Sequence, residues 1–179
     1  MSRKSSHIAV LLGSARDPSN TRKATAVVCD ELDKAGCQVT LLDPRQLTLG
    51  LPGHGQDPKV MTRMQDMVRD ADGVVMVTPE YDGSFSAAIK LMIEHLGYPS
   101  VLQNKPISLL GVASGGIGAV KALEHLRSVC GSIGGIPLPY SKSINLVDRV
   151  FDENGVVLDQ KAGKAMASAA TDLLEFLNP

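Results

Sequence analysis

The sequence predicts an α/β fold in which helices cover both faces of a parallel sheet. Short apolar runs with strand character alternate with segments of helical periodicity along the whole chain. This alternation is typical of right-handed βαβ units and of a parallel sheet. Loops rich in glycine and small polar residues follow three of the apolar runs, where the carboxyl ends of parallel strands form ligand sites. We therefore expect a doubly wound, three-layer sandwich with five strands.

Composition limits the class of protein. The chain has 179 residues and 44% hydrophobic content, which predicts one domain over residues 1–179 with an ample core. A net charge of −1 without a basic cluster argues against nucleic acid as a partner. Three cysteines without a C-x-x-C pair indicate neither a disulfide framework nor a metal site. No apolar run is long enough to cross a bilayer, so we expect a cytoplasmic protein without a membrane partner.

The expected elements follow from residue periodicity. Strands are predicted for aliphatic and β-branched runs over 8–12, 37–42, 73–78, 107–113 and 136–144, the last broken by prolines. Helices are predicted where apolar residues recur at i, i+3 and i+4, over 21–35, 58–71, 86–96, 119–129 and 160–177. Segment 45–56 is expected to be irregular. Methionines line one side of helix 58–71, where core packing is favoured over a dimer face.

The first loop has the chemistry of a phosphate site. A buried strand ends at Gly13, and a helix begins near Thr21, where free backbone N–H groups and the helix dipole favour an anion. Hydroxyl, amide and guanidinium donors gather in this loop: Ser14, Arg16, Ser19, Asn20 and Thr21. The alternative is that these side chains only cap the helix. No nucleotide P-loop or dinucleotide fingerprint is present, so a monophosphate without Mg²⁺ is expected.

Two further loops lie at the same predicted edge. Residues 79–84 form a tight turn after a buried strand, whose amides can border a flat heterocycle while Tyr81 lies against it; an ordinary turn built on Asp82 and Gly83 is the alternative. The loop that starts at Ser114 continues with two glycines and leaves room for close approach of a ring, although glycine pairs also make simple turns.

Together these loops resemble the NADPH-dependent FMN reductase family of flavodoxin-like proteins. The likeness rests on Gly13-Ser14-Ala15-Arg16, Ser19-Asn20-Thr21-Arg22, Thr78-Pro79-Glu80-Tyr81-Asp82-Gly83-Ser84 and Ser114-Gly115-Gly116. It covers roughly residues 7–145, and the proline–glutamate–tyrosine turn is its most specific part. The resemblance implies a flavodoxin-like sheet with strand order 2-1-3-4-5.

The resemblance also implies a cofactor and its contacts. It implies non-covalent FMN, with Ser14, Arg16, Ser19, Asn20 and Thr21 on the phosphate. The isoalloxazine would be bordered by Pro79, Glu80, Tyr81, Asp82 and Gly83 on one side and by Ser114, Gly115 and Gly116 on the other. NADPH or NADH would supply hydride for a small-molecule acceptor such as a flavin, quinone, azo dye or oxidised metal, by a ping-pong mechanism. Homodimers or homotetramers are usual in the family. The cofactor carries the chemistry, so no catalytic side chain is assigned.

Two positions depart from the family pattern. The turn commonly has asparagine where this chain has Asp82, and a carboxylate facing the ring would lower the flavin potential. The following helix commonly has an aspartate–tryptophan pair, where this chain has Glu94 and His95. The second departure affects the acceptor pocket and leaves the flavin site intact. A lone histidine such as His95 or His125 is more often a core or surface residue than a catalyst, and Cys130 is expected to be buried.

Other functions fit the sequence less well than a reductase does. A flavodoxin-like electron carrier is the main alternative, but flavodoxins are strongly acidic and sandwich the ring between aromatic residues, which make up 3% of this chain. The chain lacks the glycine fingerprint of a Rossmann enzyme, in which Asp43 would bind a ribose. It also lacks the G-x-S-x-G motif of a hydrolase and the acidic residues that follow the first strand of a receiver domain. The choice of NADPH or NADH stays open, because Arg16, Arg22 and Lys121 could each contact a 2′-phosphate.

Overall fold

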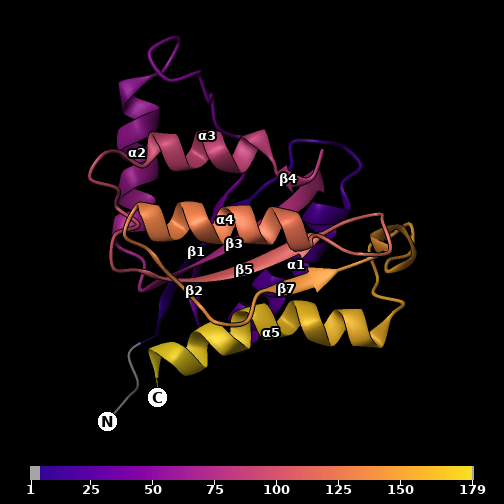
Figure 1. Ribbon diagram of the computed structural model, residues 1–179. Helices are drawn as coiled ribbons and strands as arrows, with labels where there is room; N and C mark the ends of the chain where they lie inside the picture. Colours follow the sequence, from indigo (N-terminus) through magenta and orange to yellow (C-terminus); the bar gives the residue numbers. More distant parts are fainter. Residues whose placement is uncertain (1–4, 179) are drawn as a thin grey trace.

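The computed structural model, which describes residues 5–178, has a central parallel sheet between two layers of helices (Figure 1). The strands are β1 (His7–Leu12), β2 (Gln38–Leu42), β3 (Gly73–Tyr81), β4 (Ser84–Phe85), β5 (Pro106–Val112), β6 (Ile136–Pro137) and β7 (Lys142–Ile144). The helices are α1 (Asn20–Lys34), α2 (Pro58–Arg69), α3 (Ala87–His95), α4 (Val120–Ser132) and α5 (Gln160–Leu177), with a 3₁₀ turn η1 (Val147–Arg149).

The strands lie in the order β2-β1-β3-β5-β6, and β7 also pairs with β5. All of these pairs are parallel, which confirms the predicted flavodoxin-like order, because β5 is the fourth predicted strand and β6 with β7 is the fifth. The carboxyl ends of β1, β3 and β5 therefore meet at one edge of the sheet, as the sequence predicts.

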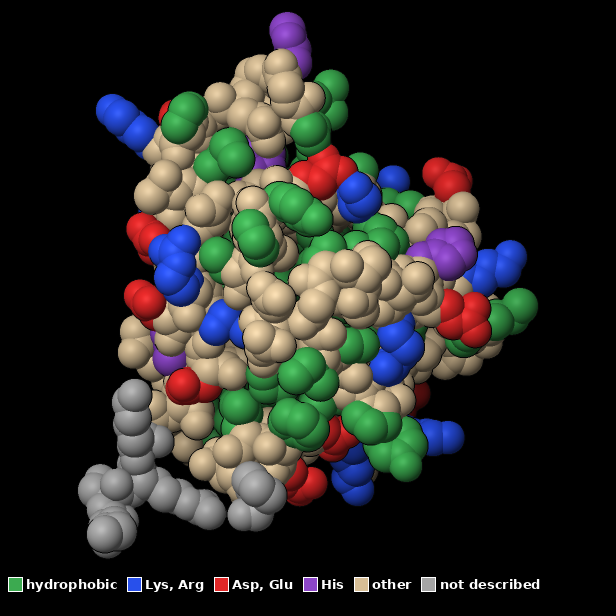
Figure 2. Space-filling model, turned by 60° about the vertical axis from the view of Figure 1, so that its left-hand side comes forward, with side chains coloured by type: hydrophobic (Ala, Val, Ile, Leu, Met, Phe, Trp, Pro, Cys, Tyr) green, Lys and Arg blue, Asp and Glu red, His purple; other side chains and the backbone are tan. Residues whose placement is uncertain are grey.

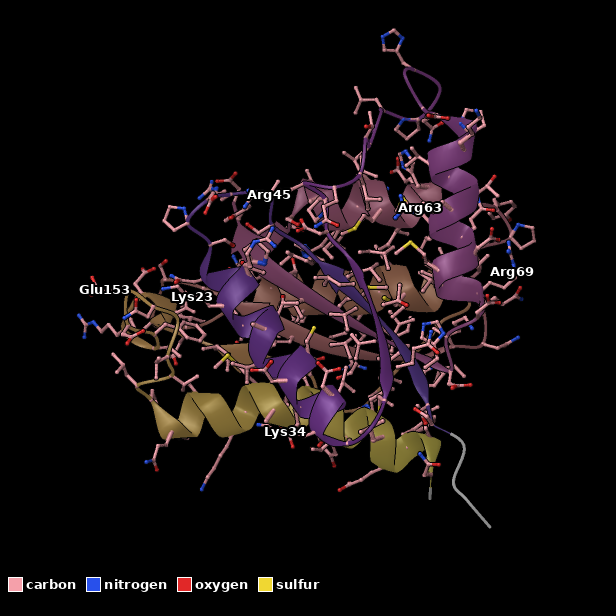
Figure 3. The ribbon with its side chains drawn as sticks, turned by 180° about the vertical axis from the view of Figure 1, so that it is seen from behind. Lys23, Lys34, Arg45, Arg63, Arg69 and Glu153 are labelled. Atoms are coloured by element: carbon pink, nitrogen blue, oxygen red, sulfur yellow. The ribbon has the colours of Figure 1, made fainter. Side chains whose placement is uncertain are left out.

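Each face of the sheet has its own helical layer and core. Alternate residues of β1 point to opposite faces: Ile8 and Val10 pack with residues of α1 and α5, whereas Ala9 and Leu11 pack with residues of α2, α3 and α4. Seen from behind, α1 and α5 lie side by side across one face (Figure 3). The apolar runs predicted as strands are buried on both sides for this reason.

The third strand is longer than predicted. Its expected end at residue 78 is wrong, because β3 continues to Tyr81 and turns back as a hairpin with β4, with Glu80 opposite Phe85. Asp82 and Gly83 connect the two strands with φ values of 50° and 74°, as in a type I′ turn. Proline is tolerated at position 79 because β1 ends opposite Val77, so one side of β3 has no neighbouring strand there.

The fifth predicted strand is two short strands separated by a proline-containing segment. β6 and β7 both pair with β5, and the chain between them leaves the sheet. Arg127 of α4 holds this segment, because its guanidinium donates to the carbonyl of Leu138 (2.6 Å) and to Ser141 Oγ (2.8 Å). Proline lacks the N–H that a continuous strand needs, which explains the break.

The predicted helices form at the expected places, with ends that differ by a few residues. Met64 of the methionine-rich helix α2 is fully buried, and Met67 packs against the same core, which confirms the core interpretation for these two residues. Met61 instead lines a surface groove. Within the described residues, no helix is long and apolar enough to cross a membrane.

A candidate cofactor cleft at the carboxyl edge of the sheet

A cleft of about 290 Å³ opens at the carboxyl ends of the central strands. Its walls come from the loop before α1, the β3–β4 hairpin, the end of β5 and the turn η1. The lining residues are Arg16, Pro18, Ser19, Asn20, Thr21, Pro79, Glu80, Tyr81, Val112, Ala113, Ser114, Val147 and Asp148. The structure therefore brings all three loops singled out in the sequence to one cleft.

The remaining predicted residues lie around this cleft without lining it. Ser14 is buried beneath the first loop, and Asp82 is exposed at the tip of the hairpin next to Gly83. Gly115 and Gly116 are exposed, and a Cβ atom added to either would meet no atom within 4 Å. The glycine loop thus leaves open space beside Ser114, as expected from its composition.

Gly13 allows the first loop to start close to the neighbouring strand. Its N–H donates to the carbonyl of Val77 at 2.7 Å, and a Cβ atom would lie 2.6 Å from that oxygen and 2.8 Å from Ile89 Cγ1. No other residue fits this approach without displacing backbone. The end of β1 is therefore held tightly against β3 where the loop begins.

Hydroxyl groups connect the first loop to the start of α1. Ser19 Oγ donates to Ser14 Oγ at 3.0 Å and accepts the N–H of Arg22 at 3.2 Å, so Ser19 is the N-cap of α1. The capping interpretation thus holds for Ser19. Asn20 and Thr21 belong to the first turn of the helix and line the cleft, so the positive end of α1 opens onto it.

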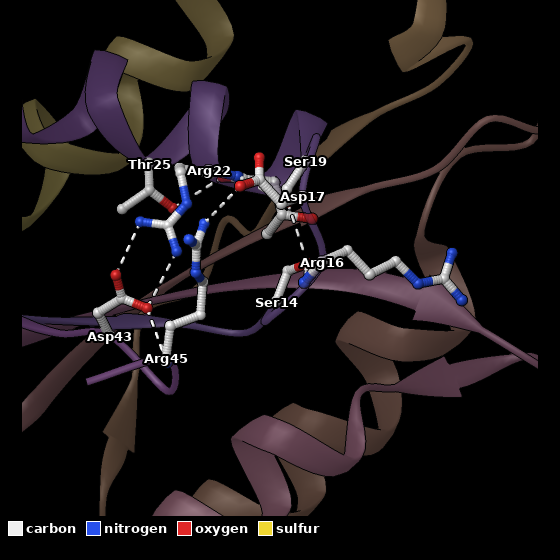
Figure 4. Close-up of polar contacts among 9 residues, drawn as sticks. Ser14, Arg16, Asp17, Ser19, Arg22, Thr25, Asp43 and Arg45 are labelled. Atoms are coloured by element: carbon white, nitrogen blue, oxygen red, sulfur yellow. Dashed lines mark hydrogen bonds and ion pairs between the residues drawn. The ribbon is translucent and has the colours of Figure 1, made fainter. Parts of the chain in front are cut away.

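A second group of contacts braces the loop from the side of β2 (Figure 4). Arg22 donates two hydrogen bonds to the buried carboxylate of Asp43, at 2.8 and 3.0 Å. Arg45 donates its N–H to Asp43 and its guanidinium to Asp17 in the loop. The hydrogen bonds from Arg22 lower the pKa of Asp43 in spite of its burial. Neither Arg22 nor Asp43 lines the cleft, which removes both from the candidate ligand contacts.

Among the described residues that line the cleft, Arg16 is the one with a positive charge. Its guanidinium lies 4.2 Å from the centroid of the Tyr81 ring, a cation–π contact between the first loop and the hairpin. Figure 4 shows the Arg16 side chain extending away from Arg22, Asp43 and Arg45.

The turn η1 adds to the cleft an acid that the sequence analysis missed. Asn20 Nδ2 donates to Asp148 Oδ1 at 2.7 Å, and both residues line the cleft. Asp148 lies in η1, directly after β7. The signal that could have found it is position, because a loop after the fifth strand lies at the same carboxyl edge as the other three.

The hairpin is attached to α4 as well as to the sheet. Glu80 Oε2 accepts the N–H of Ala122 at 3.0 Å, and Ser84 Oγ lies 3.0 Å from His125 Nδ1. Both contacts join the hairpin to the first half of α4. The position of the hairpin beside the cleft therefore depends on this helix.

The other reactive side chains lie away from the cleft. His95 is fully buried and its Nδ1 is 2.8 Å from the carbonyl of Leu91, so it is a core residue. Burial raises the pKa of the Cys130 thiol to about 12, as expected for an unreactive core cysteine. Across residues 5–178, no group of three or more His, Cys, Asp or Glu side chains could hold a metal ion.

The fold and the cleft define a flavodoxin-like α/β protein with a cleft at the carboxyl edge of its sheet. Its sequence matches the profile of the NADPH-dependent FMN reductase family over residues 6–170. The chain belongs to this family, whose members are oxidoreductases that use FMN and NAD(P)H.

Individual relatives agree with this assignment. The chain is 28% identical to an FMN-dependent NADPH-azoreductase from Staphylococcus haemolyticus, over 94% of each chain. It is 37% identical to a 2-hydroxy-1,4-benzoquinone reductase from Burkholderia sp, over 45% of this chain and 49% of that enzyme. For several curated relatives the match thus spans about half of their own length. In fold, the chain is similar to the flavoenzyme NAD(P)H:acceptor oxidoreductase FerB from Paracoccus denitrificans, with a TM-score of 0.78, 22% identity and coverage of 96% and 97%.

Proposed function

We propose that this protein holds FMN in the cleft and passes electrons from NAD(P)H to quinone or azo acceptors. The observation that carries the proposal is the convergence of the start of α1, Arg16 and Ser114, the first residue of the glycine loop, in one cleft. The acceptor classes come from the relatives named above, which reduce azo compounds and a benzoquinone.

The donor groups of the cleft fit the parts of FMN. The first turn of α1 and the side chains of Arg16, Ser19 and Asn20 would hold the phosphate, as anion sites at helix starts do. Asp148 is an acceptor beside them and suits the hydroxyl-bearing ribityl chain. Gly115 has no side chain that would block the approach of a flat ring.

Bound FMN would supply the redox chemistry that connects NAD(P)H with a second substrate, in ping-pong order. The protein contributes binding, orientation and electrostatics, and we assign no side chain as a general acid or base. Arg16 would neutralise the charge of the phosphate. Ser14 accepts a hydrogen bond from Ser19 and so orients its hydroxyl, and the β3–β4 hairpin positions Tyr81 beside Arg16.

We further propose that two copies of the chain associate through an apolar groove. The groove has a volume of about 690 Å³ and runs between α2, α3 and α4, with Met61, Ile93 and Val129 in its lining. Hydrophobic side chains gather on the face that carries α2 (Figure 2), and Tyr98 beside the groove is 99% exposed. Size-exclusion chromatography with light scattering measures the molar mass in solution. A dimer would have twice the mass of the chain and a tetramer four times that mass, whereas the mass of one chain would contradict the proposal.

A cytoplasmic location is also proposed. The three cysteines are free thiols, as expected in a reducing compartment.

A visible spectrum of the purified protein with added FMN tests the proposed reductase. NADPH and NADH are then added in turn without oxygen. Loss of the bound-flavin absorbance supports the reductase. Binding without loss of absorbance favours the electron carrier, and failure to bind FMN would contradict the cleft assignment.

A further inference from the structure

Helix α4 differs from the other helices in how it begins. α1, α2, α3 and α5 each follow a residue whose side chain accepts an N–H of the first turn: Ser19, Asp57, Ser86 and Asp159. Ala119 precedes α4 and has no side-chain acceptor. The first N–H groups of a helix lack intrahelical partners, so α4 needs acceptors from elsewhere in the chain.

Glu80 supplies one of these acceptors from the hairpin. Its Oε2 accepts the N–H of Ala122, in the first turn of α4, at 3.0 Å. The same side chain lines the cleft. Glu80 therefore performs for α4 the role that a local cap performs for the other helices, and it does so with a full negative charge next to the candidate ligand.

Several charges surround the contact between Glu80 and the start of α4. A helix N-terminus carries about half a positive charge, so one carboxylate more than cancels it. Lys121 is exposed, with its Cδ 3.7 Å from where a Cβ of Gly83 would lie, and Arg16 is held over Tyr81. Neither cation forms an ion pair with Glu80 in the described chain. The Glu80 carboxylate thus adds to this wall a negative charge that forms no ion pair within the described residues.

We propose that Glu80 is a positioning residue that caps α4 across the cleft wall and lowers the reduction potential of the flavin held there. The proposal rests on the proposed FMN site. Reduction adds electrons to the flavin, and a carboxylate in the same cleft disfavours that added negative charge. The flavin becomes a stronger reductant for acceptors, and uptake of hydride becomes less favourable. Without the carboxylate, the positive end of α4 would have the opposite effect.

Glu80→Gln separates the charge from the hydrogen bond. The glutamine carbonyl can still accept the N–H of Ala122, whereas the negative charge is removed. The matched control is Glu124→Gln, the same change of charge at an exposed position on α4 that does not line the cleft. Both variants and the unmodified protein are loaded with FMN, and the reduction potential is measured by equilibrium titration with dithionite and a reference dye.

We expect the flavin in Glu80→Gln to have a more positive reduction potential. The expected shift is about 30 mV for a two-electron couple, which corresponds to a tenfold higher ratio of reduced to oxidised flavin at a given potential. Glu124→Gln should stay at the unmodified value. An equal potential in all three proteins, or an equal shift in both variants, would overturn the proposal. Glu80→Ala gives a second readout that does not need flavin. Because this variant loses the cap of α4, its thermal unfolding temperature should be lower than that of Glu80→Gln. Equal unfolding temperatures for the two variants would contradict the capping role of Glu80. If the unmodified protein bound no FMN, the proposed function would fail instead.

Discussion

The first loop and the β3–β4 hairpin face each other across the cleft but depend on different neighbours. The loop is fixed to the sheet, through the contact of Gly13 with Val77 and the ion pair of Asp17 with Arg45. The hairpin is fixed to α4, through Glu80 and Ser84. The cation–π contact of Arg16 with Tyr81 joins the two walls. This division means that anion affinity and the electrostatics of the cleft can be changed separately.

The largest expected effect is at the anchor of the first loop. Gly13→Ala places a methyl group against backbone at 2.6 Å, so β1 and β3 must separate. We expect a loss of about 3 kcal/mol in the free energy of unfolding, together with weaker FMN binding. Urea unfolding measures the first and flavin fluorescence the second. For stability alone, Gly115→Ala is the control, because its Cβ would meet open space; equal stability of the two variants would contradict the packing argument.

Arg16→Ala tests the cation of the loop. We expect FMN binding to weaken by roughly 1.5 to 3 kcal/mol, the size of a charge-assisted contact, with little change in stability because the side chain is exposed. Fluorescence titration gives the affinity. Arg149→Ala is a matched control, since this exposed arginine does not line the cleft. Unchanged affinity in Arg16→Ala would remove this residue from the site.

The brace behind the loop gives a pH-dependent prediction. The pKa of Asp43 is lowered in the folded protein by Arg22, so the pair stabilises the fold above the ordinary aspartate pKa. This stabilisation is lost as the pH falls through the lowered folded pKa. At pH 7 we expect Asp43→Asn to be less stable by about 1 to 2 kcal/mol, a reduced figure because the Arg22 side chain is 33% exposed. The difference should shrink below pH 4 in urea unfolding; a difference that persists there would argue against the ion pair.

The smallest effect is expected at the hairpin tip. Asp82 is exposed and adopts a positive φ that asparagine also accepts. Asp82→Asn should change stability by less than about 0.5 kcal/mol and shift the flavin potential less than Glu80→Gln. A larger shift at position 82 would show that the tip carboxylate, and not Glu80, sets the charge of this wall.

The sequence was informative where local rules apply. Strand and helix positions and the three loops at the carboxyl edge follow from periodicity and from glycine and hydroxyl composition, whereas the strand order follows from the family resemblance. The hairpin was missed because Pro79 normally ends a strand, and its position at the point where β1 stops depends on the pairing of distant segments. Asp148 was missed because its contact with Asn20 joins residues far apart in the chain.

Residue types alone determined the class of fold and the resemblance that points to FMN, and they predict that the first loop binds an anion. Only the tertiary structure decided which charged residues pair with one another and which of them line the cleft. Arg22 and Asp43 neutralise each other behind the loop, Arg16 faces the cleft, and Glu80 caps a helix that follows it much later in the sequence. These assignments depend on distances between segments that the fold brings together, and electrostatic and hydrogen-bond energies are set by such distances.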